Sequence, residues 1–271
     1  MSITLRALNT LSGLGIDFQK QTHVYDRNNA LSVDIYHNNA PSEKNTCLFF
    51  LHSGLWNANR KENFRFVAYR FLKKGYHVAL ADYRKFSSAQ LPEITGDAAI
   101  GLKTTSEKFD KKTKIVVMGH SSGAQIGALL CLDPTYLQTA NMDTNMIDKF
   151  VGLSGPYNVS DHIDEQGNLP ASGSKKNQAS LLAQDAQHII PPMMLIHGEQ
   201  DRDVMPSNAR SLAKAVNKKS NGFAQSLILP NMGHISTIGA IARPNWNIET
   251  RMVMRAIDNF LSFDARAVFS R

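Results

Sequence analysis

Short runs of hydrophobic residues recur along the chain, separated by longer stretches of mixed polarity. A continuous apolar run of this kind is typical of a strand buried on both faces of a sheet, whereas strict alternation is typical of a half-buried strand. The segment 32–36 alternates and is expected to be a half-buried strand. The continuous runs, expected to be buried strands, are 46–51, 77–81, 114–118, 149–153, 193–197 and 224–229.

Between these predicted strands, apolar residues recur with helical spacing. The helices expected from this spacing are 64–74, 97–109, 122–131, 207–217 and 249–263. Strands that alternate with helices predict βαβ units, and therefore an α/β fold with a mostly parallel sheet covered by helices on both faces. Because the pattern continues from 20 to 263 without a linker, we expect a single domain over residues 1–271.

One polar segment interrupts the alternation. Residues 160–187 are rich in Gly, Ser, Asn and Lys, and we expect most of them to form a solvated surface loop. The segment lies between two predicted strands of the C-terminal half, a position that also suits a lid beside a binding site. A short cap or lid insertion is therefore expected over residues 156–190.

Composition and charge narrow the class of protein. The 271 residues are 42% hydrophobic and 20% charged, which excludes a disordered or collagen-like chain. Lys and Arg number 30 and Asp and Glu 23, so the formal net charge is +7. This surplus favours weak contact with anionic surfaces. The basic residues are dispersed and not interleaved with aromatic residues, so no nucleic-acid groove is expected.

Cysteine content and hydropathy bear on the compartment. Cys47 and Cys131 are too few for a disulfide framework or a thiolate metal site, and each lies in an apolar run that predicts a buried free thiol. No apolar stretch approaches the roughly 18 residues of a membrane span, so no stable membrane insertion is expected. The N-terminal segment is a poor match to a signal peptide. A cytoplasmic protein is the simplest expectation, and the sequence does not predict an oligomeric state.

The most informative motif is Gly119-His120-Ser121-Ser122-Gly123, between a predicted strand and a predicted helix. In an α/β sheet, glycines at such a motif allow the backbone to turn sharply, and the central Ser121 is held on a strained turn with its hydroxyl exposed. The N–H of Ser122 and the helix dipole then face any negative charge that develops there. Ser121 is therefore the candidate nucleophile.

A serine nucleophile needs a base, and the base needs an orienting carboxylate. In this architecture the chain order is Ser, then acid, then His. Asp201 follows the predicted strand 193–197, and His234, the only histidine after Asp201, follows the predicted strand 224–229. We therefore expect Ser121, Asp201 and His234 to meet at one edge of the sheet as a catalytic triad.

The acid has two neighbours that are also carboxylates. Asp203 is the alternative to Asp201, unless it caps the helix that begins near Pro206 or pairs with Arg202. Glu199 lies closer to the strand and is expected to be solvated.

An oxyanion hole is expected in the loop that follows the predicted strand 46–51, at His52-Ser53-Gly54-Leu55-Trp56. The N–H groups of Ser53 and Gly54 are expected to converge with that of Ser122. His52 is expected to fix the loop by hydrogen bonds rather than to transfer protons.

Candidate walls of a substrate pocket flank these motifs. They are Leu55, Trp56 and Tyr157, although residues of these types are equally suited to a core. No cluster of His, Asp, Glu and Cys has the spacing of metal ligands, and no glycine-rich loop of the phosphate-binding kind is present. No metal is therefore expected.

The chain resembles α/β-hydrolases of the carboxylesterase/lipase group whose members carry an HGGxW oxyanion loop. Besides the motifs above, the resemblance rests on Asp82-Tyr83-Arg84 after a core strand, on Leu91-Pro92 with Asp97 at the entry to the next helix, and on residues 152–158. It covers nearly the whole chain. Isoprenylcysteine methylesterase-like and kynurenine formamidase-like proteins share this layout.

The resemblance implies an α/β-hydrolase fold with Ser121 as nucleophile, Asp201 as acid and His234 as base, and no cofactor. One residue departs from the family pattern: Ser53 stands where the family usually has its first glycine. A side chain at this position bears on the geometry of the oxyanion loop and leaves the triad unaffected.

The implied function is a carboxylesterase that cleaves a small-molecule ester through an acyl-enzyme. A short-chain ester is favoured over a long-chain lipid because no long apolar lid is visible. An arylformamidase acting on a formyl amide is an alternative, since the same triad would serve. A proline-directed peptidase is less favoured, because no separate gating domain is visible. A non-catalytic binding module on this fold stays open, as does a surface role of the net charge, which would bind anionic lipid or nucleic acid in a salt-dependent way.

Overall fold

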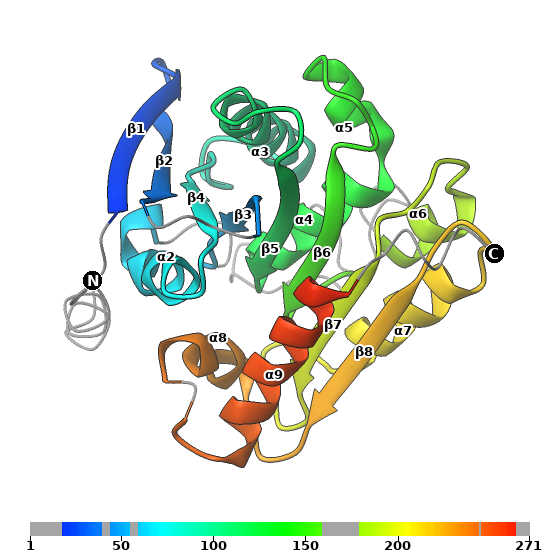
Figure 1. Ribbon diagram of the computed structural model, residues 1–271. Helices are drawn as coiled ribbons and strands as arrows, with labels where there is room; N and C mark the ends of the chain where they lie inside the picture. Colours follow the sequence, from blue (N-terminus) through cyan, green and yellow to red (C-terminus); the bar gives the residue numbers. More distant parts are fainter. Residues whose placement is uncertain (1–17, 40–43, 55–58, 159–178, 244, 264–271) are drawn as a thin grey trace.

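The computed structural model describes residues 18–39, 44–54, 59–158, 179–243 and 245–263. Its centre is an eight-stranded sheet in the order β1-β2-β4-β3-β5-β6-β7-β8 (Figure 1). The pairs β1–β2 and β2–β4 are antiparallel, and every other pair is parallel. The strands are β1 (Phe18–Asp26), β2 (Leu31–Asn38), β3 (Thr46–Leu51), β4 (His77–Ala81), β5 (Lys114–His120), β6 (Ile147–Leu153), β7 (Met193–Gly198) and β8 (Ala224–Leu229).

Helices cover both faces of this sheet, as the sequence predicted. On the face toward the viewer in Figure 1 lie α2, α8 and α9, and α3, α4, α5, α6 and α7 lie behind. The helical segments are η1 (Lys61–Phe64), α2 (Arg65–Leu72), α3 (Leu91–Ser106), α4 (Ser122–Leu132), α5 (Pro134–Thr139), α6 (Ala179–Asp185), α7 (Ser207–Asn217), α8 (His234–Ala242) and α9 (Ile248–Ser262).

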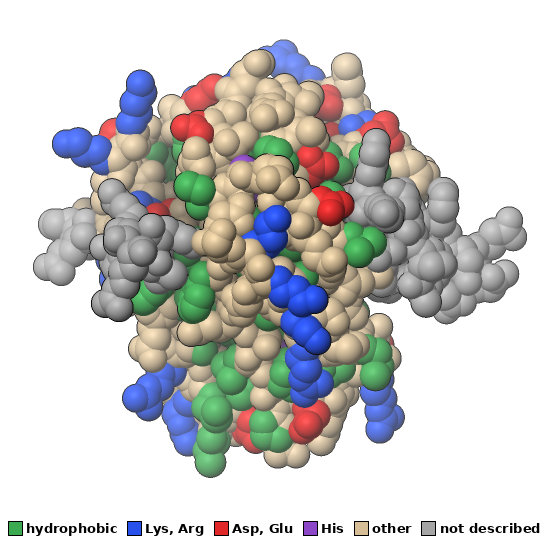
Figure 2. Space-filling model, turned by 90° about the vertical axis from the view of Figure 1, so that its right-hand side faces the viewer, with side chains coloured by type: hydrophobic (Ala, Val, Ile, Leu, Met, Phe, Trp, Pro, Cys, Tyr) green, Lys and Arg blue, Asp and Glu red, His purple; other side chains and the backbone are tan. Residues whose placement is uncertain are grey.

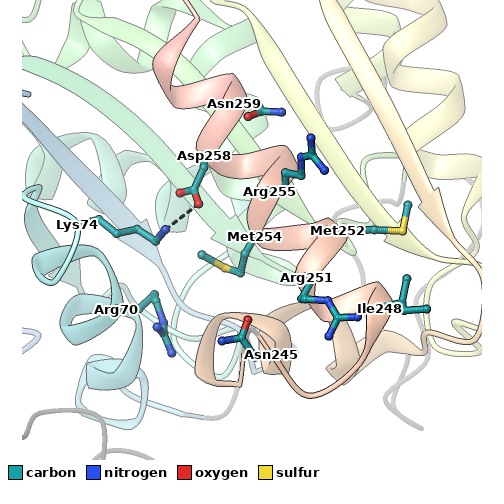
Figure 3. Close-up of a pocket in the computed structure, with 10 residues that line it drawn as sticks. All are labelled: Arg70, Lys74, Asn245, Ile248, Arg251, Met252, Met254, Arg255, Asp258 and Asn259. Atoms are coloured by element: carbon teal, nitrogen blue, oxygen red, sulfur yellow. Dashed lines mark hydrogen bonds and ion pairs between the residues drawn. The ribbon is translucent and has the colours of Figure 1, made fainter.

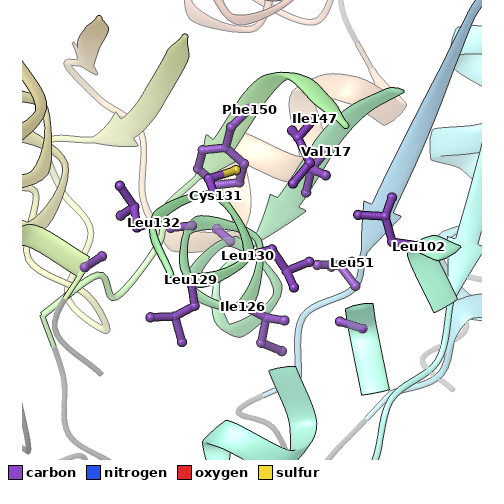
Figure 4. Close-up of a cluster of buried hydrophobic side chains, with 14 of the residues drawn as sticks. Leu51, Leu102, Val117, Ile126, Leu129, Leu130, Cys131, Leu132, Ile147 and Phe150 are labelled. Carbon is purple, nitrogen blue, oxygen red and sulfur yellow. The ribbon is translucent and has the colours of Figure 1, made fainter. Parts of the chain in front are cut away.

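Each face of the sheet packs into its own hydrophobic core. Helix α4 is central to one of them, and all eleven of its residues are buried. Figure 4 shows its side chains among those of β3, β5 and β6 and of α3. The labelled residues are Leu51, Leu102, Val117, Ile126, Leu129, Leu130, Cys131, Leu132, Ile147 and Phe150. A helix that is apolar on every side needs partners all round it, and so α4 is fixed firmly behind the sheet.

All seven predicted strands are present, and the structure adds an eighth. Two of the seven differ in burial from the prediction: residues 32–36 of β2, expected to be half-buried, are buried on both faces, whereas β8, expected to be buried, is an edge strand and partly exposed. Strand β1 was not predicted, because its residues neither alternate cleanly nor form an apolar run, and most of them are exposed at the edge of the sheet. Helix α3 begins six residues before the predicted start at 97. Gln90 and Glu93 form a capping box there, and Pro92 in the first turn needs no N–H partner.

Helices α5, α6 and α8 were also missed by the sequence prediction. Helix α6 lies in the polar segment that was expected to be a loop or cap, and two of its alanines are buried against the core. Residues 159–178, the middle of that segment, lie outside the described residues. The single domain over 1–271 and its cap at 156–190 therefore stay predictions.

The parallel strands have one consequence for the site. Because β3, β5, β6, β7 and β8 all run in the same direction, the loops that follow them open at the same edge of the sheet. This carboxyl edge is the lower end of β6, β7 and β8 in Figure 1. Within the described residues, no helix is long and apolar enough to cross a membrane.

Candidate active site

The turn between β5 and α4 holds Ser121 in a strained conformation, with φ at 53° and ψ at −124°. Two glycines make this turn possible. A Cβ on Gly119 would lie 2.3 Å from the carbonyl oxygen of Gly123, so the strand and the helix cross too closely for any side chain. The strained turn predicted for Ser121 is therefore present in the structure. The hydroxyl, expected to be exposed, is not: Ser121 is buried, with 4% of its surface exposed.

The same turn packs directly on the loop after β3. A Cβ on Gly123 would lie 2.1 Å from the carbonyl oxygen of Leu51 and 2.5 Å from that of His52. Ser53 and Gly54, which come directly after His52, therefore lie beside the turn that carries Ser121. The placement predicted for the oxyanion loop, beside the serine, agrees with this contact.

Asp201 lies in the loop that follows β7, and its side chain is buried. Its Oδ1 accepts hydrogen bonds from the N–H groups of Val204, at 2.8 Å, and Asp203, at 3.0 Å. Gly198 brings this loop against the loop after β8, because a Cβ there would lie 2.2 Å from the carbonyl oxygen of Met232. The loops of the predicted acid and of the predicted base thus touch through their backbones.

His234 connects the other two residues. Its Nδ1 lies 2.8 Å from Oδ2 of Asp201, and its Nε2 lies 2.8 Å from Oγ of Ser121. Since the carboxylate accepts a hydrogen bond from Nδ1–H, the proton of the neutral ring is on Nδ1. Nε2 is then unprotonated and accepts a hydrogen bond from the Ser121 hydroxyl. His234 is the first residue of α8 rather than a loop residue, with Gly233 at the N-cap. The structure therefore brings Ser121, His234 and Asp201 into one hydrogen-bonded chain.

The environment keeps Asp201 ionised. Burial raises the pKa of this carboxyl, but hydrogen bonds from His197 and His234 and from the Val204 N–H outweigh burial and hold the pKa well below its ordinary value. A permanently charged carboxylate is the partner that can stabilise a protonated imidazole at His234.

His197, on β7, is a second histidine on the same carboxylate, and the sequence analysis did not identify it. Its side chain is fully buried, and Nε2 lies 3.0 Å from Oδ2 of Asp201 and 2.9 Å from the carbonyl oxygen of Val204. Both neighbours are acceptors, so the proton of His197 is on Nε2 and is shared between them. The signal available in the sequence was a histidine four positions before the acid.

His120, between Gly119 and Ser121, packs beneath His234. The two rings lie 5.1 Å apart, and Nε2 of His120 donates to the backbone carbonyl of His234 at 3.1 Å. Burial, together with the neighbouring His234, lowers the pKa of His120 to about 3. His120 is therefore a neutral support for the backbone of His234.

The loop after β3 is held by its own contacts. His52 is buried between the rings of Tyr83 and Phe64, stacked on Tyr83 at 4.4 Å between ring centroids. Its Nδ1 donates to the carbonyl oxygen of Ser53 at 3.1 Å, and the Tyr83 hydroxyl donates to the carbonyl oxygen of His52 at 2.5 Å. Burial lowers the pKa of His52. A neutral, doubly stacked ring agrees with the predicted role of fixing the loop.

Ser53 is buried, and Gly54 has φ at 149°, a value that strongly favours glycine. The third predicted donor, Ser122, is the first residue of α4, where helix N–H groups have no acceptor within the helix.

The three residues predicted to line a substrate pocket differ in outcome. Leu55 and Trp56 lie outside the described residues. Tyr157 is fully buried in the core and presents no surface to a ligand, which matches the alternative of a core residue.

One cluster of described residues has ligand atoms close enough for a metal ion: those of Asp201, Asp203 and His234 lie within 4.8 Å of one another. Both ring nitrogens of His234 are engaged by Asp201 and Ser121, so the geometry suits proton transfer better than ion binding. Asp203 is exposed and does not cap α7, whose N-cap, Pro206, has no side-chain bond. Glu199 is exposed, as expected.

Comparison with protein families gives a match to the BD-FAE family model over residues 33–216, more than half of the chain. Two curated relatives are probable isoprenylcysteine alpha-carbonyl methylesterases. ICME of Oryza sativa subsp. japonica is 25% identical over 227 residues, which cover 74% of this chain and 54% of the relative. ICMEL2 of Arabidopsis thaliana is 20% identical over 192 residues, which cover 62% and 46%. The chain therefore spans about half the length of these relatives.

Solved structures share the fold. A thermophilic esterase of Thermogutta terrifontis, Est2, is 20% identical with a TM-score of 0.71, and the match covers 89% of this chain and 91% of that one. An esterase of Pyrobaculum calidifontis is 16% identical with a TM-score of 0.71, covering 98% and 90%. At this level of identity the likeness concerns the fold, and it confirms the α/β-hydrolase architecture predicted from the sequence.

Proposed function

The chain belongs to the BD-FAE family, and from this membership we propose that it is a serine carboxylesterase acting on short-chain or small carboxylic esters. One observation carries the proposal. The Ser121 hydroxyl, the His234 imidazole and the Asp201 carboxylate form a continuous chain with both hydrogen bonds at 2.8 Å. Such a chain activates a serine for attack on a carbonyl carbon.

The first step of the proposed reaction is acylation. Ser121 Oγ attacks the ester carbonyl carbon while Nε2 of His234 takes the hydroxyl proton, and the carbonyl π electrons move onto oxygen. Asp201 holds the imidazole in the tautomer that carries its proton on Nδ1 and stabilises the imidazolium that forms. When the tetrahedral intermediate collapses, the C–O bond breaks and the alkoxide leaves with the proton from Nε2.

The second step is hydrolysis of the acyl-enzyme. A water molecule gives one proton to Nε2 of His234 and attacks the acyl carbon. The bond to Ser121 Oγ then breaks as His234 returns the proton to the serine. The products are one carboxylic acid and one alcohol, and the enzyme is restored by groups of its own chain, with no cofactor in any step.

We propose that the oxyanion is held by backbone N–H groups of Ser53, Gly54 and Ser122. Two features support this assignment: α4 begins at Ser122, and Gly123 packs on the carbonyls of the residues that precede Ser53. Preorganised donors of this kind are worth several kcal/mol in a transition state, roughly 3–4 kcal/mol per donor.

His197 is proposed as a positioning residue for Asp201. With the N–H groups of Val204 and Asp203 on Oδ1 and the rings of His197 and His234 on Oδ2, the carboxylate is held from both sides. A carboxylate fixed in this way keeps the imidazole of His234 aligned with Ser121.

The substrate class rests on the family and on the names of the relatives. The rice and Arabidopsis relatives are named for a methylesterase activity, which is hydrolysis of an ester with a small alcohol part. The solved structures that share the fold are esterases by name. A small leaving alcohol agrees with the expectation of a short or small ester.

The proposal is tested by hydrolysis of p-nitrophenyl esters from acetate to palmitate, beside labelling by a fluorophosphonate probe. We expect turnover of the short esters, labelling at Ser121, and loss of both in Ser121→Ala. Labelling without turnover of any ester, with turnover of an N-formyl arylamide, would replace the esterase by an arylformamidase. A folded protein that is not labelled by the probe and hydrolyses none of these substrates would favour the alternative of a non-catalytic binding module.

A further inference from the structure

Helix α9 carries an unusual outward face. The residues that pack it on the sheet are Val253, Met254, Ile257 and Phe260. The opposite face carries two apolar side chains as well, Ile248 and Met252, which are 64% and 43% exposed. Exposed apolar side chains spaced four apart on a helix that already has a buried stripe mark a second contact surface.

Arginines accompany these apolar side chains. At 100° per residue, Arg251 and Arg255 lie on the same outward face of α9 as Ile248 and Met252. Just before the helix, Trp246 is 70% exposed, and the guanidinium of Arg243 stacks on its ring at 4.9 Å from the centroid. We call these residues the α9 patch; its members are Arg243, Trp246, Ile248, Arg251, Met252 and Arg255.

A groove extends the patch toward α2. It has a volume of about 690 Å³ and runs between α2 and α9. Figure 3 shows Arg70 and Lys74 on the α2 wall and Arg251 and Arg255 on the α9 wall, with Met254 between them. Arg70 is tied to the chain through its Nε, which donates to the carbonyl oxygen of Ile241 at 3.0 Å.

The charge of this surface is positive. Patch and groove together carry five cations, from Arg70, Lys74, Arg243, Arg251 and Arg255. The acidic groups beside them are Asp258, which pairs with Lys74 at 2.7 Å, and Glu249, which accepts from the amide of Asn231 at 3.3 Å. The local surplus is therefore three positive charges (5 − 2), part of the +7 of the whole chain.

We propose that the α9 patch is a docking surface for an anionic lipid bilayer. Exposed Trp, Ile and Met side chains suit the boundary between headgroups and acyl chains, and the flanking arginines suit the lipid phosphates. Charge complementarity favours this occupant: the five cations and the exposed tryptophan, contributed by α9, the segment before it and the α2 wall of the groove, match the two layers of an anionic interface.

Docking there places the proposed active site near the bilayer. The Asn231–Glu249 hydrogen bond joins the loop before His234 to the first turn of α9, so the patch begins at the carboxyl edge of the sheet. Figure 2 shows hydrophobic side chains gathered at the lower end of the face in view, the end to which β7 and β8 point in Figure 1. Ile235, 66% exposed, follows His234 at this edge.

The experiment is co-sedimentation of the full chain with sucrose-loaded vesicles of phosphatidylcholine alone or with about 30% phosphatidylglycerol, at an ionic strength of about 0.1 M. We expect binding to the anionic vesicles only. The double variant Arg251→Gln/Arg255→Gln is expected to bind at least about tenfold more weakly, since each basic residue near an anionic surface contributes several-fold. Its matched control is Lys111→Gln/Lys112→Gln, which removes the same charge from exposed residues at the other edge of the sheet and is expected to bind within about twofold of the parent.

Fluorescence provides the second readout. The chain has two tryptophans, so Trp56→Phe leaves Trp246 as the single indole reporter. We expect its emission to shift to the blue when anionic vesicles are added. Equal loss of binding in the two charge variants, or unchanged Trp246 emission on bound protein, would overturn the proposal. Failure to sediment, with a concentration-dependent oligomer that Arg251→Gln/Arg255→Gln dissociates, would assign the patch to a second copy of the chain instead.

Discussion

Two clusters of buried charge lie at the carboxyl edge of the sheet, and they differ in how their bonding capacity is used. In one, the ammonium group of Lys61 is enclosed by Asp82 at 2.6 Å, by Ser32 at 2.7 Å and by the more distant Asp34 at 4.0 Å. The other is the chain of Ser121, His234 and Asp201. Both clusters contain buried carboxylates, but their geometry indicates different roles, one structural and one in the proposed reaction.

The Lys61 cluster is closed. Asp82 accepts from the ammonium group on Oδ2 and from the Lys61 backbone N–H on Oδ1, and Asp34 accepts from Lys20 and Thr22. Every charge is matched and no strained residue is involved. Such a network holds η1 against β2 and β4, and its role is structural.

The Ser121 cluster combines a strained backbone with buried nitrogen atoms, on the histidines packed against it, that have no hydrogen-bond partner. Ser121 has a left-handed φ of 53°, and among the described residues the Nδ1 atoms of His120 and His197 are buried without a partner. Strain and unpaired polar atoms cost stability and persist where the surrounding structure enforces them. Buried charge alone therefore does not distinguish a reacting site from a structural one, whereas strain combined with incomplete bonding does.

Replacement of the serine separates the two clusters most strongly. Ser121→Ala is expected to lower kcat by about 10⁴–10⁶-fold, roughly 5–8 kcal/mol of barrier, because the nucleophile is removed. The free energy of unfolding is expected to change by less than about 1.5 kcal/mol, since alanine keeps the same backbone turn and the variant loses only the hydrogen bond between residue 121 and His234. Ester kinetics and urea unfolding on one preparation measure both quantities. A loss below about tenfold, in a folded protein, would remove Ser121 from the mechanism.

Replacement of the lysine has the opposite profile. Lys61→Met is expected to lower the free energy of unfolding by about 3–5 kcal/mol, because Asp82 is left buried without the cation that it bonds at 2.6 Å. The kcat/KM of the folded fraction is expected to change little. Lys20→Met is the matched control: this lysine bonds the same Asp34 but is 35% exposed, so the cost is below about 1 kcal/mol. Equal costs for the two variants would show that the Lys61 cluster is not a closed network.

Acid stability tests the neutral support beneath His234. Unfolded His120 takes up a proton near its ordinary pKa of 6.5, whereas in the folded protein burial lowers the pKa to about 3. Between these values only the unfolded chain is protonated, so the free energy of unfolding falls as the pH drops below about 6.5. The contribution of His120 from pH 7 to pH 5 is about 2 kcal/mol. Urea unfolding of His120→Asn beside the parent should show a pH dependence smaller by that amount, and identical slopes would contradict the assignment.

The smallest expected effect concerns the alignment of the acid. His197→Leu is expected to lower kcat about tenfold with KM nearly unchanged, because Asp201 loses one of its fixed donors. The acidic limb of the pH profile is expected to move to higher pH, since a carboxylate with fewer donors holds the imidazolium more strongly. His197→Gln, which keeps a side-chain N–H, should recover most of the rate. A fall in stability with the same pH profile would leave His197 a purely structural residue.

How far the sequence predicted this molecule depended on the range of the interactions involved. The turn at Ser121 and its flanking strand and helix follow from local pattern, because glycine spacing and apolar runs are local properties. Strand β1 and helix α6 escaped prediction because neighbours in space, rather than their own residues, decide their burial. The partnership of His197 with Asp201 was missed for a different reason: a histidine in an apolar strand reads as a core residue until its acceptors are seen.

The hydrogen bond between Ser121 and His234 joins positions that are 113 residues apart in the chain. It requires β6, β7 and β8 to be in place beside β5, and closing a loop of this length costs more conformational entropy than forming a local contact. A reactive Ser121 therefore indicates that the sheet is complete from β5 to β8. A nascent chain whose synthesis stops before β8 would contain Ser121 without His234, and its serine would therefore be unreactive.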